Sequence, residues 1–331
     1  MLSNFGNFGA DGQKATLMQN PHLQTLCAQV PVYLDGSTAH AAEALRIPVN
    51  DGALLAHARW LPGARLTVLL VHGVAGTSHS RYMQRAAAAC LAEGYHAVCL
   101  NLRGSGPGRA LSPTLYHCGL TADLDAAVAA LSRRPEVLGV LVIGFSLGGS
   151  MSLLAAAAPP VGLLGVASVS APMDLEQTVR GLQRPAARIY HHYVLRGLKS
   201  ALREHGQSWP QASPPDMVAV GLQARTVHDF DDRVMAPRYG FAGAAEYYRK
   251  SSCGPHLAEL KLPCLIVHAD DDPMVPLSTV LPYLAGASRS VTSWRCRHGG
   301  HIGFITGLGR LAWQRNTALA AVFSWMRERF Q

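Results

Sequence analysis

A serine between glycines has the clearest chemical potential in the sequence. Residues 140–154 read VLVIGFSLGGSMSLL, in which Gly144, Ser146 and Gly148 form a Gly-x-Ser-x-Gly motif. The motif lies between an apolar run, typical of a strand, and a small-residue run, typical of a helix. Glycines are needed at such a sharp turn because side chains there would clash, while the serine is held up at the edge of the sheet. We interpret Ser146 as a candidate nucleophile in preference to an ordinary Gly-Ser turn.

A serine hydroxyl becomes a strong nucleophile only when a base takes its proton and an acid orients that base. In folds that carry this motif, the acid follows a late strand and the histidine follows the last strand. Residues 265–276, LIVHADDDPMVP, put three consecutive aspartates directly after an apolar run. This pattern predicts that Asp270, Asp271 or Asp272 is the acid, and it does not by itself choose among them.

Two candidate bases lie in the glycine-rich stretch 293–304, SWRCRHGGHIGF, which follows the expected last strand. His301 is favoured over His298 because two glycines directly precede it and permit a tight loop that turns back toward Ser146. A metal site built from both histidines and the aspartates is the alternative. It is disfavoured because no further cysteine or histidine ligand accompanies the pair, and no metal is predicted.

A tetrahedral oxyanion needs two backbone N–H donors near the serine. The N–H of Leu147, at the start of the helix after Ser146, is the first candidate. Residues 66–82, LTVLLVHGVAGTSHSRY, form an apparent strand, loop and helix start, and they offer the N–H of Val74 as the second. We interpret His72, in the same stretch, as a structural histidine that hydrogen-bonds the loop.

No phosphate-binding or dinucleotide-binding motif is found. The stretch NLRGSGPG at residues 101–108 resembles a phosphate loop, but it lacks the Lys-Ser/Thr pair and the Gly-x-Gly-x-x-Gly spacing. We interpret it as a tight turn, and no cofactor is predicted.

The elements that must hold these residues follow from the alternation of short apolar runs with helical patterns. This alternation is typical of βαβ units and predicts a mostly parallel eight-stranded sheet flanked by helices. Helices are expected at residues 81–94, 119–134 and 146–158, each closed by Gly, Arg or Pro. The first two strands flank an Asp-Gly pair and are expected to form a hairpin. Strands are expected at residues 44–49, 53–60, 66–71, 95–101, 138–143, 162–168, 263–268 and 290–295.

Residues 173–262 interrupt this alternation. The interval contains six prolines, mixed helical signals and few strand signals, and it separates two expected neighbouring strands. Because functional loops gather at the carboxyl ends of parallel strands, we expect a helical lid or cap inserted into a single domain that spans residues 1–331.

Composition favours a compact globular protein, since 49% of the 331 residues are hydrophobic and 15% are charged. The N-terminal stretch lacks the pattern of a secretion signal and no apolar run is long enough to span a membrane, so a soluble cytoplasmic protein is expected. The seven cysteines are scattered without a C-x-x-C pair, which favours reduced thiols.

The net charge is +8, and much of the excess lies in the arginine-rich stretch 180–203. We favour a solvated helical face there and keep open a contact with an anionic membrane or an anionic substrate. Nucleic-acid binding is disfavoured because basic and aromatic residues are not interleaved and no known binding motif is present.

Taken together, these segments resemble the α/β-hydrolases, and most closely the YheT-like branch that groups bacterial esterase-like proteins with eukaryotic abhydrolase-domain proteins. The resemblance covers nearly the whole chain. It is carried by NPHLQTL (20–26), VHGVAGTSHSRYM (71–83), NLRGSG (101–106), YHCGLTADLDAAV (116–128), GFSLGGS (144–150), DPMVP (272–276) and GGHIGF (299–304).

The resemblance implies the α/β-hydrolase fold and a catalytic triad of Ser146, Asp272 and His301. It selects Asp272 because the family's acid immediately precedes the proline of the DP-x-VP turn, with Asp271 as the second choice. It implies hydrolysis of carboxylic esters with an acyl chain, such as acylglycerols or phospholipids. An acyltransferase that uses the same triad and a non-catalytic ligand-binding protein of this fold remain the alternatives. The oligomeric state is not predicted.

Overall fold

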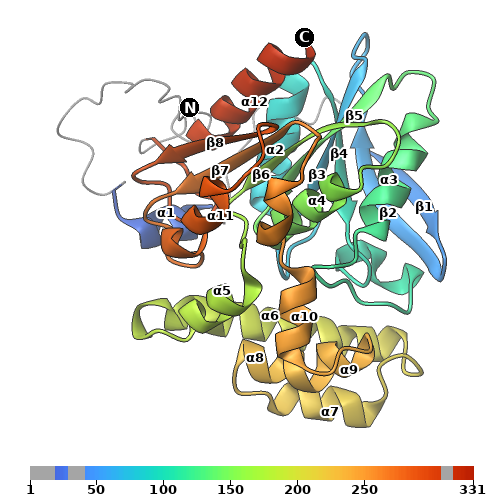
Figure 1. The fold of residues 1–331 in the computed structure, drawn as a ribbon. Coiled ribbons are helices and arrows are strands. Elements are labelled where there is room, and N and C mark those ends of the chain that lie inside the picture. The colour runs from blue at the N-terminus through green and yellow to red at the C-terminus, as the bar shows by residue number, and fades with distance from the viewer. Residues whose placement is uncertain (1–18, 29–41, 307–315) are drawn as a thin grey trace.

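The computed structural model describes residues 19–28, 42–306 and 316–331. Its centre is an eight-stranded sheet in the order β1-β2-β4-β3-β5-β6-β7-β8 (Figure 1). The first two strands form an antiparallel hairpin and β2 pairs antiparallel with β4, whereas all later pairs are parallel. The expected mostly parallel sheet is therefore confirmed.

All eight expected strands are present. The largest difference is at β5, which was expected to end at residue 143 and continues to Phe145, next to the serine turn. The strands are β1 (Glu43–Val49), β2 (Gly52–Arg59), β3 (Leu66–Val71), β4 (His96–Asn101), β5 (Gly139–Phe145), β6 (Leu163–Val169), β7 (Cys264–Ala269) and β8 (Val291–Cys296).

Helices cover both faces of the sheet, which explains why its central strands are apolar at nearly every position. On β3, Val68 and Leu70 pack into the core under α2 and α12, and Leu69 and Val71 pack into the core under α3 and α4. The two helix pairs lie on opposite sides of the sheet in Figure 1. The helices are α2 (Arg81–Ala92), α3 (Ala122–Ser132), α4 (Leu147–Ala157) and α12 (Thr317–Phe330).

Every described element between β6 and β7 is helical. Apart from η4, which packs against α4, these helices lie together beyond one end of the sheet in Figure 1. They are α5 (Leu175–Leu182), η2 (Pro185–Ala187), α6 (Arg188–Ser208), α7 (Pro215–Gln223), α8 (Val227–Phe230), the π-helical turn η3 (Asp231–Met235), α9 (Ala236–Arg238), α10 (Ala244–Ser251) and η4 (Gly254–Ala258).

The remaining short elements border the edges of this framework. They are α1 (Pro21–Cys27), η1 (Gly106–Leu111), η5 (Leu277–Thr279) and α11 (Leu281–Ala285). The expectation about an N-terminal targeting segment concerns residues 1–20, and residues 1–18 of this stretch lie outside the described residues.

Candidate active site

Ser146 sits in the turn from β5 into α4, with backbone angles of φ 52° and ψ −123°. This backbone conformation is strained for a residue other than glycine, and such strain is concentrated at functional sites. The flanking glycines are needed because of close backbone contacts. A Cβ on Gly144 would lie 2.4 Å from the carbonyl oxygen of Gly148, and one on Gly148 would lie 2.4 Å from that of His72.

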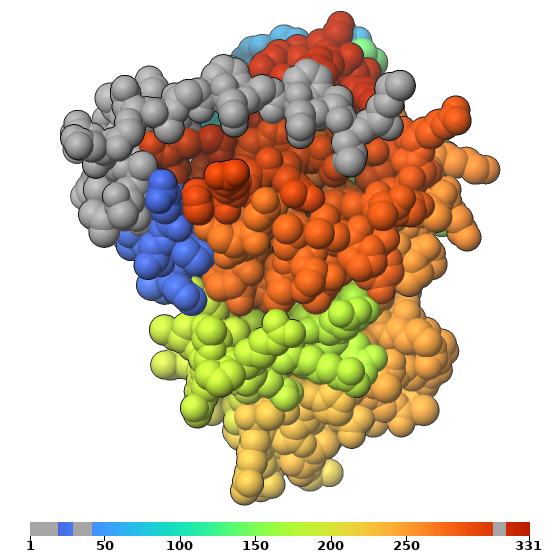
Figure 2. All heavy atoms as spheres, turned by 60° about the vertical axis from the view of Figure 1, so that its left-hand side comes forward, coloured from blue at the N-terminus to red at the C-terminus, as the bar shows by residue number. Residues whose placement is uncertain are grey.

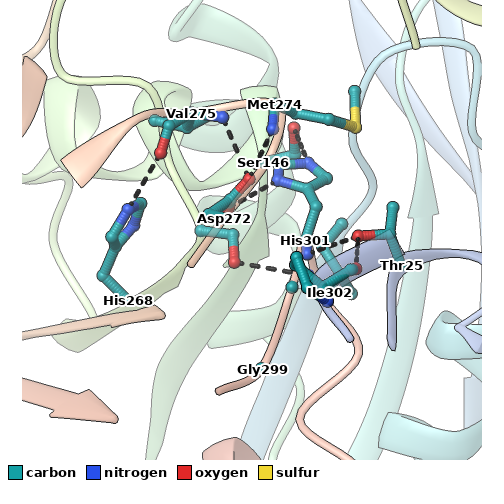
Figure 3. A network of polar contacts seen from close by, with 12 residues as sticks. Thr25, Ser146, His268, Asp272, Met274, Val275, Gly299, His301 and Ile302 are labelled. Atoms are coloured by element: carbon teal, nitrogen blue, oxygen red, sulfur yellow. Dashed lines mark hydrogen bonds and ion pairs between the residues drawn. The ribbon is translucent and has the colours of Figure 1, made fainter. Parts of the chain in front are cut away.

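A continuous line of hydrogen bonds joins Ser146 to an imidazole and a carboxylate (Figure 3). The Nε2 atom of His301 lies 2.9 Å from Ser146 Oγ, and its Nδ1 atom lies 2.8 Å from Oδ2 of Asp272. All three side chains are at least nine-tenths buried. When Nδ1 carries the proton and donates to Asp272, Nε2 is free to accept the proton of Ser146.

The second carboxylate oxygen of Asp272 is held by the turn that follows it. Its Oδ1 accepts hydrogen bonds from the N–H groups of Met274, at 2.8 Å, and Val275, at 2.9 Å. Behind this turn, Nε2 of the buried His268 lies 3.1 Å from the carbonyl oxygen of Val275. Burial lowers the pKa of His268, so a neutral ring donates this bond and fixes the turn.

The other two aspartates have different partners. Asp271 Oδ1 accepts from the N–H groups of Gly299, at 3.0 Å, and Gly300, at 2.9 Å, and its Oδ2 lies 3.1 Å from Nδ1 of His298. Asp270 pairs instead with Arg295 on β8. The structure thus brings Asp272 and His301 to Ser146, while Asp271 and His298 shape the loop that carries His301.

Helix α1 braces this loop from the other side, a contact that the sequence analysis missed. Thr25 Oγ1 accepts the N–H of His301 at 2.9 Å (Figure 3). The Gln24 side chain pairs with both backbone groups of Ile305, donating to its carbonyl oxygen at 2.7 Å and accepting from its N–H at 2.8 Å. His22 lies 2.7 Å from the hydroxyl of Tyr190 on α6, so α1 also contacts the helices between β6 and β7.

Figure 2 shows this contact on the surface, where the blue atoms of α1 lie against the orange and red atoms of the C-terminal part of the chain. The segment NPHLQTL is one of the motifs that carry the family resemblance, but nothing in the sequence predicted its contact with the histidine loop. The partners are separated by 276 residues in the chain, so spacing gives no clue to the contact.

The loop after β3 carries Val74, the second of the two expected oxyanion donors. Two tyrosine hydroxyls anchor it, since Gly73 N–H donates to Tyr82 at 3.0 Å and Ala75 N–H donates to Tyr116 at 2.9 Å. Between them, the N–H of Val74 makes no hydrogen bond with the residues that the structure describes. Val74 and Leu147 both line the cavity that Ser146 enters.

His72 is fully buried behind this loop. Its Nδ1 lies 2.8 Å from the carbonyl oxygen of Gly73, and its Nε2 accepts the N–H of Leu102 at 3.2 Å. Burial lowers the pKa of His72 to about 4, so the ring is neutral at physiological pH. Its contacts agree with the structural interpretation.

A cavity extends from Ser146 and His301 to the helices between β6 and β7. Aliphatic side chains dominate its lining, and they come from several elements. Examples are Leu175 and Val179 on α5, Val194 and Leu198 on α6, and Met274 and Val275 from the Asp272 turn. Such a lining suits the hydrocarbon part of a ligand.

Two observations bear on other kinds of site. In the part of the chain that the structure describes, no group of three His, Cys, Asp or Glu side chains could hold a metal ion. Within the same residues, no helix is both long enough and apolar enough to cross a membrane.

Comparison with known proteins gives the class of the protein. The chain matches the α/β hydrolase fold family over residues 67–308, and it belongs to that family. Within the family it is similar to YheT of Escherichia coli (strain K12), at 30% identity over 72% of this chain and 71% of YheT. The expected YheT-like branch is therefore confirmed.

Two eukaryotic groups of relatives carry functional names. Phospholipase ABHD3 of Mus musculus is 28% identical over 74% of this chain, and the match spans only 59% of that protein. Monoacylglycerol lipase ABHD2 of Homo sapiens is 24% identical over 86% of this chain and 74% of that protein.

Solved structures agree on the fold. Esterase Pf2001 of Pyrococcus furiosus has a TM-score of 0.60 at 15% identity, covering 91% of this chain and 96% of that one. The 2,6-dihydroxy-pseudo-oxynicotine hydrolase has a TM-score of 0.59 at 17% identity, covering 93% of this chain and 71% of that one.

Proposed function

We propose that the protein is a serine esterase that cleaves carboxylic esters through an acyl-enzyme. The observation that carries the proposal is the unbroken line of hydrogen bonds from Ser146 Oγ through His301 to Asp272. A serine, a histidine and a buried carboxylate in this geometry activate the hydroxyl for attack on a carbonyl carbon.

In the proposed reaction, Ser146 Oγ forms a bond to the ester carbonyl carbon while its proton passes to Nε2 of His301. The tetrahedral intermediate collapses, the bond to the alcohol oxygen breaks, and His301 returns the proton to the departing alcohol. A water molecule then repeats the attack on the acyl-enzyme with His301 as the base, which releases the carboxylic acid and free Ser146. Asp272 keeps the imidazole in the tautomer that each step needs.

The N–H groups of Leu147 and Val74 are the proposed donors to the oxyanion. Donors fixed before the reaction stabilise the developing charge without reorganisation. The anchoring of the Val74 loop by Tyr82 and Tyr116 supports this role.

The proposed substrates are esters with an aliphatic chain. The aliphatic lining of the cavity supports this class, and so do relatives named phospholipase and monoacylglycerol lipase. We further propose that residues 173–262 act as a cap within a single domain, because residues of α5 and α6 line the cavity above Ser146. Contact of this cap with an anionic lipid surface is also proposed.

The test is hydrolysis of a p-nitrophenyl ester series of increasing acyl length by the wild type and by Ser146→Ala. We expect the wild type to turn over several chain lengths and to react with a fluorophosphonate probe, and Ser146→Ala to do neither. Turnover that appears only when an alcohol acceptor is added would favour acyl transfer. A folded wild type that neither hydrolyses esters nor reacts with the probe would overturn the proposal and favour a binding protein.

A further inference from the structure

Two of the buried side chains that line the cavity, a histidine and an aspartate, have no role in the proposed reaction. His117, in the loop between β4 and α3, and Asp231, in the π-helical turn η3, both line it. Each is more than nine-tenths buried, with 9% and 7% of its surface exposed. Ionisable groups in such surroundings are costly, so their presence inside an otherwise aliphatic ligand cavity requires an explanation.

Asp231 uses only one of its two carboxylate oxygens within the described structure. Oδ2 accepts a hydrogen bond from the Tyr248 hydroxyl at 2.7 Å. Oδ1 accepts none from the described residues, and no cation among them pairs with the carboxylate. Burial raises the pKa of Asp231 to about 7, which is the shift expected of a carboxyl without a counter-charge.

His117 supplies the complementary hydrogen-bonding character. Its Nδ1 accepts the N–H of Gly119 at 3.2 Å, which leaves the proton of the neutral ring on Nε2. Burial, and secondarily the charge of Arg103, lower the pKa of His117 to about 4, so the neutral form dominates at physiological pH. Nε2–H is therefore a donor, and no described residue accepts from it.

The two groups belong to one continuous wall. The ring of His117 lies 5.9 Å from that of Tyr247, which in turn lies 5.4 Å from that of Tyr248, the partner of Asp231. All four residues line the cavity. We call His117, Asp231, Tyr247 and Tyr248 the polar wall, and it contrasts with the aliphatic lining supplied by α5 and α6.

We propose that the polar wall is a subsite for a free hydroxyl group of the ester substrate, donated to Asp231 Oδ1 and accepting from His117 Nε2–H. The inference rests on the proposed esterase function and specifies its substrate: an amphiphilic ester with one aliphatic part and one hydroxyl-bearing part. A hydroxyl is both donor and acceptor, so it matches the hydrogen-bonding character of both buried groups. An ammonium group could satisfy Asp231 but would leave the His117 donor without an acceptor.

The test compares esters that differ only by a hydroxyl in place of a terminal methyl. One arm puts the hydroxyl in the acyl part, with ω-hydroxyhexanoyl against heptanoyl p-nitrophenyl esters. The other puts it in the alcohol part, with ω-hydroxybutyl against pentyl hexanoate, and the acid released is titrated. A third member of each arm carries an ammonium group at the same position, and shorter and longer chains are included.

In at least one arm, we expect the wild type to prefer the hydroxyl ester by about tenfold in kcat/KM, which is the size of one well-made hydrogen bond. Asp231→Leu and His117→Phe should each abolish this preference. Asp232→Asn is the control, because Asp232 is next to Asp231 in sequence, is exposed and does not line the cavity. The preference should survive in it.

Equal or better turnover of the methyl or ammonium ester in both arms at every length would overturn the inference, as would a preference that persists in a folded Asp231→Leu. Binding of the same uncleaved esters to Ser146→Ala, measured by calorimetry, separates the two proposals. A hydroxyl preference in binding without any hydrolysis by the wild type would sink the esterase proposal and retain the subsite. Hydrolysis by the wild type without a hydroxyl preference would overturn the subsite and retain the esterase proposal.

Discussion

Asp270, Asp271 and Asp272 are consecutive, yet each carboxylate has a different partner. Asp272 contacts His301, Asp271 accepts from the backbone of the histidine loop, and Asp270 pairs with an exposed arginine. The chemical consequence of a substitution should therefore differ sharply among three neighbours of the same residue type.

We expect Asp272→Asn to lower kcat by roughly 10³- to 10⁴-fold, because an amide cannot hold the imidazole tautomer that accepts the serine proton. Asp271→Asn should lose much less, since an amide oxygen still accepts the two backbone N–H groups. Asp270→Asn is the matched control and should stay near the wild type. Ester kinetics together with thermal melting of all three variants make the comparison, and equal losses for Asp271→Asn and Asp272→Asn would count against the assignment.

Asp231 gives a prediction about stability and pH. Its pKa is about 7 in the folded protein and near 3.8 in the unfolded chain, so the folded state binds the extra proton between these values. The wild type therefore loses stability from this group as the pH rises from about 4 to about 7. The titratable groups around it are Tyr247 and Tyr248 on α10, Asp232, which follows it in sequence, and His228, whose ring contacts that of Tyr248.

Asp231→Asn keeps the shape and removes the titration. We expect the unfolding free energy of Asp231→Asn minus that of the wild type to increase between pH 5 and pH 8, whatever its value at pH 5. Once Asp231 of the folded wild type is fully ionised, this difference should stay constant. Urea unfolding at several pH values measures this directly. If this difference in unfolding free energy is flat or decreases with pH, the environment of the Asp231 carboxyl does not oppose its ionisation.

At the scale of elements, α1 acts as a brace for the histidine loop. Its contact is tight, because a Cβ on Gly300 would lie 2.5 Å from the carbonyl oxygen of Pro21, and one on Gly303 would lie 2.4 Å from that of Gln24. A small error in the position of His301 changes its distance to Ser146, and misplacement by about 1 Å can cost on the order of 10²-fold in rate.

Thr25→Val keeps the size of the side chain and removes the acceptor for the His301 N–H. We expect kcat to fall about tenfold or more while KM changes little, and Thr25→Ser to restore most of the loss. Leu26→Ala, at an exposed position on the same helix, is the control. If Thr25→Val shifted KM and left kcat intact, or if Thr25→Ser failed to rescue it, α1 would have no positioning role.

The sequence predicted those elements whose signal is local. The strands are visible because residues buried on both faces give continuous apolar runs, and the serine turn is visible because its glycines are close together in the chain. The contact of Thr25 with His301 could not be predicted, because 276 residues separate the two in the chain. The polar wall could not be predicted either, because His117, Asp231 and Tyr248 line one cavity only after the helices between β6 and β7 pack against the rest of the chain. The helix α12 was also missed, although it packs with α2 on one face of the sheet.

For the molecule as a whole, the position of its charge matters more than the total of +8. On α6 and the turn before it, Arg184, Arg188 and Arg196 are exposed, and two apolar side chains between them are also exposed: Ile189 by 61% and Tyr193 by 53%. Exposed apolar residues flanked by arginines on one helix face are typical of segments that contact a lipid interface. An anionic lipid surface complements this charge.

We expect the protein to bind vesicles that contain anionic lipid, and the double variant Arg188→Glu with Arg196→Glu to bind at least about thirtyfold more weakly, at about 1 kcal/mol per lost arginine. Rising salt should weaken wild-type binding and turnover of vesicle-borne esters, while turnover of a soluble short ester stays constant, because screening acts on exposed charges.

The control is Arg133→Glu with Arg289→Glu, two exposed arginines outside the cap that change the net charge by the same amount. If both double variants lost vesicle binding equally, the total charge rather than the cap face would drive the interaction. If neither lost it, the cap would not be the membrane contact.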